Sequence, residues 1–145
     1  HTNDAAGAVT RLIDMGVEPF LIASSVEGVL AQRLVRRICH ECEEAYAPDP
    51  TDLPHDFRLR AGQTLTRGVG CRACRQTGFR GRVGIYELLS LDAEIREMIM
   101  QRINAPTIAE RAKERDRLCT LRQDGFAKTL DGVTTMSEVM RALTV

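Results

Sequence analysis

Two cysteine pairs constrain the folding of this chain more than any other sequence feature. The pairs are Cys39-x-x-Cys42 and Cys71-x-x-Cys74, and 28 residues lie between them. The segment from 39 to 81 is interrupted by prolines and glycines and has few large apolar side chains, so we expect no hydrophobic core built by this segment alone. It therefore needs another source of stability.

The spacing of these cysteines predicts a structural zinc site. Each C-x-x-C turn presents two thiolates to one face of a metal ion, and two turns complete a tetrahedral sulfur shell. Because the protein supplies all four ligands, the site is closed and structural rather than catalytic. An apparent zinc-binding free energy of about 10–16 kcal/mol is enough to order a few dozen residues. Disulfide bonds and an iron–sulfur cluster are the alternatives, but a cytoplasmic chain and two knuckles on a loop favour zinc.

Two further residues could take part in metal binding or thiol chemistry. His40 lies inside the first cysteine pair and could replace a ligand, but with four cysteines available we expect it to face solvent. Cys119 lies between Leu118 and Leu121 with no adjacent base, which is typical of a small core residue rather than a nucleophile.

The overall charge balance excludes broad electrostatic attraction to a polyanion. Twenty basic residues offset twenty acidic ones, so the chain as a whole has no net field for nucleic acid or anionic lipid. Apolar residues make up 43% of the chain, and no apolar stretch approaches the roughly 20 residues that span a bilayer. We therefore expect a globular cytoplasmic chain.

Charge is nevertheless separated within the cysteine segment. Residues 41–56 carry six acids and no lysine or arginine, whereas residues 58–82 carry seven arginines and no acid. The simpler interpretation is that the two halves fold against each other; the alternative is a basic face for a protein partner or an anionic membrane surface. Few aromatic residues lie near the arginines, so no nucleic-acid partner is expected.

Apolar periodicity outside this segment predicts mainly helices. We expect a first helix from Asn3 or Asp4 to Gly16, and a second that starts at Pro19 and continues to Ile38. A strand is predicted over 83–89, followed by a helix that starts near Asp92. Three capping boxes then predict three short helices: Thr107 with Glu110, Thr120 with Gln123, and Thr135 with Glu138. The second helix is predicted from an i+4 row: Ile22, Val26, Leu30, Leu34 and Ile38.

Several runs in the chain resemble the type II secretion ATPases and the related type IV pilus assembly ATPases. The resemblance lies in the Q-R-L-V-R run at 32–36, both cysteine pairs, the T-G-F-R-G-R-V-G-I-Y-E run at 77–87, and the closing L-R-x-D-G at 121–125. It implies a RecA-like motor that forms a homo-hexameric ring at the inner membrane. In that family ATP hydrolysis drives assembly of pseudopilus or pilus subunits, and in type II secretion it powers protein export.

The resemblance also implies a division of this chain. The fold class is an α/β fragment, mainly α-helical: the C-terminal part of a RecA-like P-loop motor domain with an inserted zinc module and a helical tail. Residues 1–38 are assigned to the ATPase core, 39–81 to the zinc insertion, and 82–145 to a strand plus helical subdomain. The sequence has no G-x-x-x-x-G-K-[ST] motif, which the family places before His1. ATP and Mg²⁺ are therefore expected only in the full-length protein, and the chain alone is predicted to be an inactive ATPase.

The same resemblance assigns roles to three other residues. His1 coincides with the histidine of the family's His box and is a candidate phosphate sensor, the alternative being a disordered terminal residue. Arg33 and Arg36 are candidates for contact with nucleotide or with a neighbouring subunit, the alternative being solvated side chains. The implied partners are inner-membrane platform proteins, and the implied location is cytoplasmic, peripheral to the inner membrane. A pilus assembly ATPase, or a non-catalytic zinc-stabilised docking module for a platform protein, is the alternative function.

Overall fold

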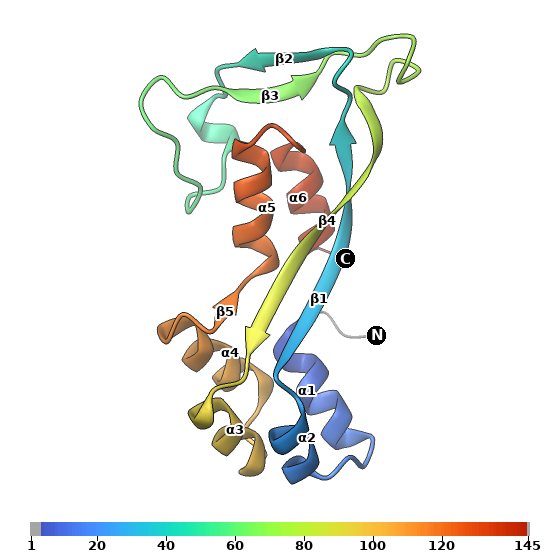
Figure 1. The fold of residues 1–145 in the computed structure, drawn as a ribbon. Coiled ribbons are helices and arrows are strands. Elements are labelled where there is room, and N and C mark those ends of the chain that lie inside the picture. Colours follow the sequence, from blue (N-terminus) through green and yellow to red (C-terminus); the bar gives the residue numbers. More distant parts are fainter. Residues whose placement is uncertain (1–3, 145) are drawn as a thin grey trace. The chain divides into compact units, whose positions relative to one another are not determined.

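A computed structural model of the chain, in which residues 4–144 are described, shows a mixed α/β fold (Figure 1). The described residues form these helices: α1 Ala5–Asp14, α2 Pro19–Ser25, the 3-10 helix η1 Pro50–Asp52, α3 Ala93–Met100, α4 Ala105–Glu114, α5 Leu121–Leu130 and α6 Met136–Leu143. The strands are β1 Gly28–Ile38, β2 Glu43–Tyr46, β3 Leu65–Gly68, β4 Phe79–Ser90 and β5 Leu118–Cys119. The α/β class is confirmed, and the strands β1 and β4 make the fold less helical than predicted.

The chain divides into two compact units. The first unit comprises residues 4–32 and 86–121, and the second comprises residues 33–85 and 122–144. The boundary between residues 32 and 33 falls inside β1, and the boundary between residues 85 and 86 falls inside β4. These two strands are neighbours in a three-stranded sheet of order β1-β4-β5. Strands β2 and β3 form a separate antiparallel sheet.

The first unit buries an apolar core between its helices and the sheet. Its buried members include Val9 of α1, Ile22 of α2, Ile95 and Ile99 of α3, and Ile108 of α4. The capping predictions hold at two of these helices. Asp4 accepts a hydrogen bond from the backbone N–H of Gly7 at 2.6 Å, and Asp92 accepts one from Ile95 at 3.0 Å. Gly16 follows α1 with φ of +93°, the left-handed conformation that ends many helices.

The predicted helix from Pro19 to Ile38 is wrong beyond Ser25, because the chain turns and continues as strand β1. The error has a simple physical cause. A row of apolar residues at i+4 spacing lies on one face of a helix, but four is also a multiple of two, so the same row lies on one face of a strand. Along β1 the side chains alternate, with Leu30 and Leu34 exposed and Val35 buried. Gly28, at the start of the strand, is the signal that the helical interpretation overlooked.

The capping predictions for the later helices are confirmed only in part. Thr135 caps α6 by accepting a hydrogen bond from the N–H of Glu138 at 3.4 Å. Thr107, however, lies inside α4, whose cap is Asn104. Only helices were predicted after Asp92, and the structure adds β5, a two-residue strand that pairs with β4.

A buried carboxylate joins two helix starts in the first unit. The predicted strand over 83–89 lies within β4, and Glu87 on this strand is only 6% exposed. One oxygen accepts from the N–H of Ala5 at 2.8 Å, and the other accepts from the N–H of Leu121 at 3.4 Å. These are the first residues of α1 and α5, where backbone N–H groups have no partner within the helix. Glu87 thereby satisfies two donors that would otherwise be buried and unpaired.

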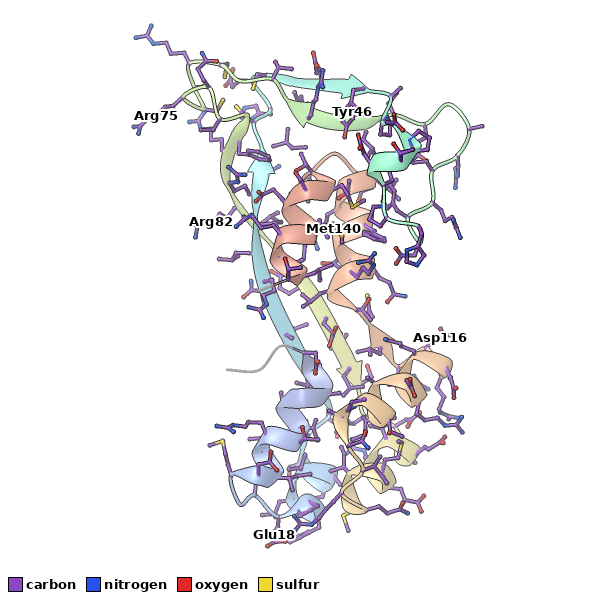
Figure 2. The ribbon with its side chains drawn as sticks, turned by 180° about the vertical axis from the view of Figure 1, so that it is seen from behind. Glu18, Tyr46, Arg75, Arg82, Asp116 and Met140 are labelled. Carbon is purple, nitrogen blue, oxygen red and sulfur yellow. The ribbon has the colours of Figure 1, made fainter. Side chains whose placement is uncertain are left out.

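The second unit has a core of its own. In Figure 1 helices α5 and α6 lie side by side, with the β2–β3 hairpin across their ends. Phe57, Leu65 and Met136 are buried together, and the ring of Phe57 meets that of Phe126 edge-on at 5.0 Å between centroids. Tyr46 of β2 and Met140 of α6 pack against this cluster (Figure 2). The segment between the cysteine pairs therefore does contribute to a core, because α5 and α6 supply the apolar side chains that it lacks.

Candidate metal centre

The four cysteines of the two pairs converge in the second unit. Their sulfur atoms all lie within 4.8 Å of one another, and the structure shows no disulfide bond among them. Cys39 and Cys74 are buried, whereas Cys42 and Cys71 are half-buried. A cluster of four neighbouring thiols is the arrangement that the cysteine spacing predicted.

The distances between these sulfurs fit a tetrahedral metal site. Cys39 Sγ lies 3.9 Å from Cys71 Sγ, Cys42 Sγ lies 3.9 Å from Cys74 Sγ, and Cys71 Sγ lies 3.7 Å from Cys74 Sγ. Zinc–sulfur bonds of about 2.3 Å in a tetrahedron place neighbouring sulfurs about 3.8 Å apart. A disulfide would require about 2.05 Å. The donor set and its size therefore fit zinc.

Strand pairing brings the two cysteine pairs together. Strand β2 begins directly after Cys42, and β3 ends shortly before Cys71. The antiparallel register sets Glu43 opposite Gly68, and Val69 N–H donates to the Cys42 carbonyl at 3.0 Å. Both pairs consequently lie at the same end of the hairpin.

The backbone of the second pair is bent sharply around its sulfurs. Arg75 and Gln76 both adopt left-handed conformations, with φ of 54° and 63°. Such conformations are unfavourable for residues with side chains and persist where the surroundings impose them. Gln76 N–H donates to the Cys71 carbonyl at 2.9 Å, which closes the turn.

Backbone donors single out one sulfur of the cluster. Cys74 Sγ lies 3.2 Å from the backbone N of Cys71 and 3.3 Å from that of Gly78. Burial raises the pKa of the Cys74 thiol, but these N–H groups outweigh burial and lower the pKa to about 6. Burial and the neighbouring thiols instead raise the pKa of Cys42 to about 12. The backbone donors therefore favour the thiolate form of Cys74, the form in which cysteine binds a metal.

Two glycines make the close backbone approach beside the cluster possible. A Cβ atom on Gly78 would lie 2.3 Å from the carbonyl oxygen of Gly68, and one on Gly68 would lie 2.0 Å from that of Gly78. Gly78 also has φ of +75°. The position therefore excludes a side chain both by conformation and by space.

We expect Gly78→Ala to lower the free energy of unfolding by about 3–5 kcal/mol, because backbone atoms must move to admit the new methyl group. Gly81→Ala is the matched control, since Gly81 has φ of +79° but nothing within 4 Å of its Cβ position. That variant should show only the conformational cost, about 1–2 kcal/mol. Urea unfolding of both variants measures the difference; equal losses would contradict the role given to the close approach.

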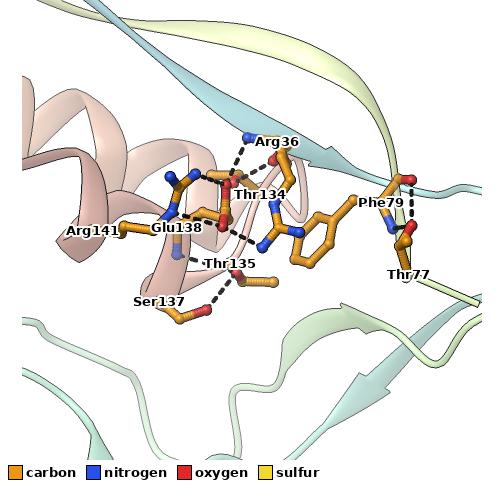
Figure 3. A network of polar contacts seen from close by, with 8 residues as sticks. All are labelled: Arg36, Thr77, Phe79, Thr134, Thr135, Ser137, Glu138 and Arg141. Atoms are coloured by element: carbon orange, nitrogen blue, oxygen red, sulfur yellow. Dashed lines mark hydrogen bonds and ion pairs between the residues drawn. The ribbon is translucent and has the colours of Figure 1, made fainter.

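A buried ion-pair network lies beside the cysteine segment, residues 39–81 (Figure 3). Glu138 of α6 is 2% exposed and accepts from the Arg36 backbone N–H at 2.9 Å and from the Arg36 guanidinium at 2.7 Å. Arg141 donates to the same carboxylate at 2.8 Å. Thr134 donates to the Arg36 carbonyl at 2.8 Å, and the Arg36 guanidinium lies 4.2 Å from the centre of the Phe79 ring. These contacts fasten α6 to strand β1.

Little in the sequence indicated this network. Glu138 was predicted only as the reciprocal partner of Thr135 in a capping box, and its carboxylate bonds Arg36 and Arg141 instead. The available signal was a glutamate whose neighbours on α6, Val139 and Ala142, are buried. An acid within the apolar face of a helix usually has a cationic partner.

The acidic and basic halves of the cysteine segment form an ion pair across strands β2 and β3. Arg67 of the basic half pairs with Glu44 of the acidic half at 2.6 Å, as the β2–β3 register allows. Asp56 of the acidic half instead pairs with Arg122 of α5 at 2.6 Å. Partial neutralisation within the segment is therefore confirmed for Glu44. The acidic charge of Asp56 is neutralised from outside the segment, by helix α5.

The other residues singled out in the sequence have mixed outcomes. His40 is confirmed as a solvent-facing residue, with its side chain 73% exposed. Cys119 was predicted to be a small core residue, and this is wrong, because it is exposed on β5. His1 lies outside the described residues. For Arg33 and Arg36, contact with nucleotide or a neighbouring subunit stays a prediction.

No helix among residues 4–144 is both long and apolar enough to cross a bilayer.

The chain is similar to proteins of bacterial secretion and pilus assembly. The sequence profile of the family described as Type II/IV secretion system protein matches residues 1–141. Type II secretion system protein E of Pseudomonas aeruginosa is 46% identical over 142 residues, which cover 97% of this chain and 28% of that protein. Type II secretion system ATPase E of Vibrio cholerae is 46% identical, again over 97% of this chain and 28% of that protein. Type IV pilus assembly ATPase PilB of Thermus thermophilus is 48% identical over 97% of this chain and 16% of that protein. The chain thus spans 16–28% of the length of these relatives.

Proposed function

Because the chain belongs to the type II/IV secretion system protein family, we propose that it is the carboxy-terminal region of an ATPase that powers type II protein secretion. The observation that carries this proposal is the 46% identity to two type II secretion proteins over 97% of the chain. In the whole protein, ATP and Mg²⁺ bind to segments beyond this sequence, which has no P-loop motif. The chain by itself hydrolyses no ATP.

Within that protein the second unit provides a structural zinc site. Cys39, Cys42, Cys71 and Cys74 hold the ion, and their four sulfurs leave no coordination position for water or substrate. The ion supplies no catalytic chemistry there. Its contribution is to fix the ends of β1, β3 and β4, from which the cysteine pairs project.

Family membership supports the remaining assignments of this proposal. Residues 1–38 belong to a RecA-like core, 39–81 to the zinc insertion, and 82–145 to a C-terminal subdomain. The whole protein works as a homo-hexamer in the cytoplasm, bound at the inner membrane to platform proteins of the secretion system. His1 senses the nucleotide phosphate, and Arg33 and Arg36 contact nucleotide or a neighbouring subunit.

Two alternative functions have support of their own. The 48% identity to PilB favours a pilus assembly ATPase. The closed cysteine cluster in a chain without a P-loop favours a non-catalytic docking module for a platform protein.

A domain exchange distinguishes these functions. The corresponding region of type II secretion system protein E of Pseudomonas aeruginosa is replaced by this chain, and export of the secreted proteins is measured in cells that lack the native protein. We expect the chimera to restore export, and the same exchange in a pilus assembly ATPase to restore pili poorly. A chimera that assembles pili but does not export protein would favour the pilus alternative. A purified chimera that binds platform protein while hydrolysing no ATP would favour the docking module.

A further inference from the structure

Three arginines line a hollow in the second unit. The hollow has a volume of about 530 Å³, and its lining residues are Leu34, Arg36, Arg82 and Arg141. Arg36 and Leu34 come from β1, Arg82 from β4, and Arg141 from α6. All four belong to the same compact unit, so the hollow does not depend on how the two units are arranged. No acidic side chain lines it.

Two of these guanidinium groups are held in place by neighbouring side chains. Glu138 receives hydrogen bonds from both Arg36 and Arg141, and Arg36 is also stacked on Phe79 (Figure 3). A guanidinium has five N–H donors, and these bonds use only some of them. The two arginines are therefore oriented by these partners and keep unused donors for a ligand.

The positive charge of the hollow is only partly neutralised by the surrounding residues. Glu138 accepts from Arg36 through its backbone and side chain and from Arg141 through two nitrogens, so its two oxygens are fully used. Arg82 is exposed and makes no ion pair within residues 4–144 (Figure 2). One buried carboxylate thus pairs with two of the three guanidinium groups, and the charge of Arg82 is not balanced by it. An uncompensated charge of this kind attracts an anion.

We propose that this hollow binds a phosphate group, with Arg82 as its free ligand and Arg36 and Arg141 as its positioned ligands. Tetrahedral phosphate oxygens match the planar fork of arginine, which binds them through paired hydrogen bonds. A phosphomonoester or pyrophosphate accepts from several guanidinium groups at once, and the hollow has the volume to admit it. The phosphate is either free in solution or part of a lipid headgroup.

The test uses the zinc-loaded chain and two phosphate sources. Inorganic pyrophosphate is titrated while the arginine Nε–Hε resonances are followed by NMR, and sedimentation is measured with phosphatidylcholine vesicles with and without phosphatidylglycerol. We expect pyrophosphate to shift the resonances of Arg36, Arg82 and Arg141. Arg82→Gln should weaken this binding about ten-fold, because it removes one charge-assisted ligand. Arg82 makes no ion pair in the described part of the chain that the substitution could break, so zinc content and circular dichroism should stay unchanged.

Arg60→Gln is the matched control, since it removes the same charge from an exposed position of the same unit outside the hollow. Pyrophosphate binding that depends on Arg82 but not on Arg60 assigns the site to free phosphate. Vesicle binding with this same dependence assigns it to a lipid headgroup. The proposal is overturned if neither probe binds, or if Arg60→Gln weakens binding as much as Arg82→Gln, which would reveal only diffuse attraction to the arginines of the unit.

Discussion

Replacing Cys71 with serine should reduce bound zinc from one ion per chain to far less than one and unfold the segment between the cysteine pairs. The reason is the size of the metal contribution. A structural zinc supplies about 10–16 kcal/mol of apparent binding energy, which is as large as the whole stability of a typical domain, about 5–15 kcal/mol. With three thiolates and one hydroxyl the tetrahedral shell is incomplete, and the small cluster around Phe57, Leu65 and Met136 must hold the segment alone. Elemental analysis measures the metal directly.

The structure supplies the control for this variant. Cys119 is the fifth cysteine, is exposed, and lies in the first unit outside the sulfur cluster. Cys119→Ser should therefore retain one zinc per chain. If Cys71→Ser retains it as well, four-cysteine ligation is wrong. If the untreated chain is folded without metal, the zinc proposal as a whole fails.

Amide hydrogen exchange measures which parts of the chain lose protection when zinc is lost. The first unit has its own core, which includes Val9, Ile22 and Ile95. The two cysteine pairs belong to the second unit. Amides of α1 to α4 should therefore stay protected in Cys71→Ser, while those of β2 and β3 lose protection. Uniform loss of protection would show that the two units unfold together.

The metal cluster could be predicted from sequence because its information is local. A C-x-x-C turn is defined by four residues, and two such turns in a chain with few other ligands leave little choice of partners. The helix starts at Asp4 and Asp92 were predictable for the same reason, since a capping side chain bonds a backbone group only a few residues away. Such features require no knowledge of the tertiary structure.

The features that could not be predicted depend on distant partners. Strand β1 has the same i+4 apolar row as a helix, and it becomes a strand because β4, more than 40 residues later, pairs with it. Glu138 and Arg36 are separated by 102 residues, and Glu87 and Ala5 by 82. Sequence alone shows each of these acids as an ordinary charged residue. Only the fold reveals that each is buried against a particular donor.

Glu138→Gln should lower the free energy of unfolding at pH 7 by about 3 kcal/mol. Removing one partner of a buried ion pair typically costs about 3–5 kcal/mol. The loss should lie at the low end because Arg36 and Arg141 are half-exposed, so water can solvate them once the carboxylate is gone. Glu43→Gln is the matched control, since Glu43 is exposed on β2 in the same unit and should change stability by less than about 0.5 kcal/mol.

The pH dependence gives this prediction a second, independent measurement. Burial raises the pKa of Glu138, but the hydrogen bonds from Arg36 and Arg141 outweigh burial and lower it to about 2, against an ordinary value of 4.5. A carboxyl group with a depressed pKa in the folded state stabilises the protein fully above its unfolded-state pKa, and this contribution falls as the pH drops from about 4.5 towards 2. The stability difference between the wild type and Glu138→Gln should therefore be constant from pH 7 to about pH 5. It should then shrink by about 1 kcal/mol by pH 3.5.

Urea unfolding at several pH values, with Glu43→Gln measured in parallel to subtract the effect of acid on the zinc thiolates, provides the comparison. A difference that stays constant down to pH 3.5 would show that the Glu138 carboxylate is not held ionised by its two arginines.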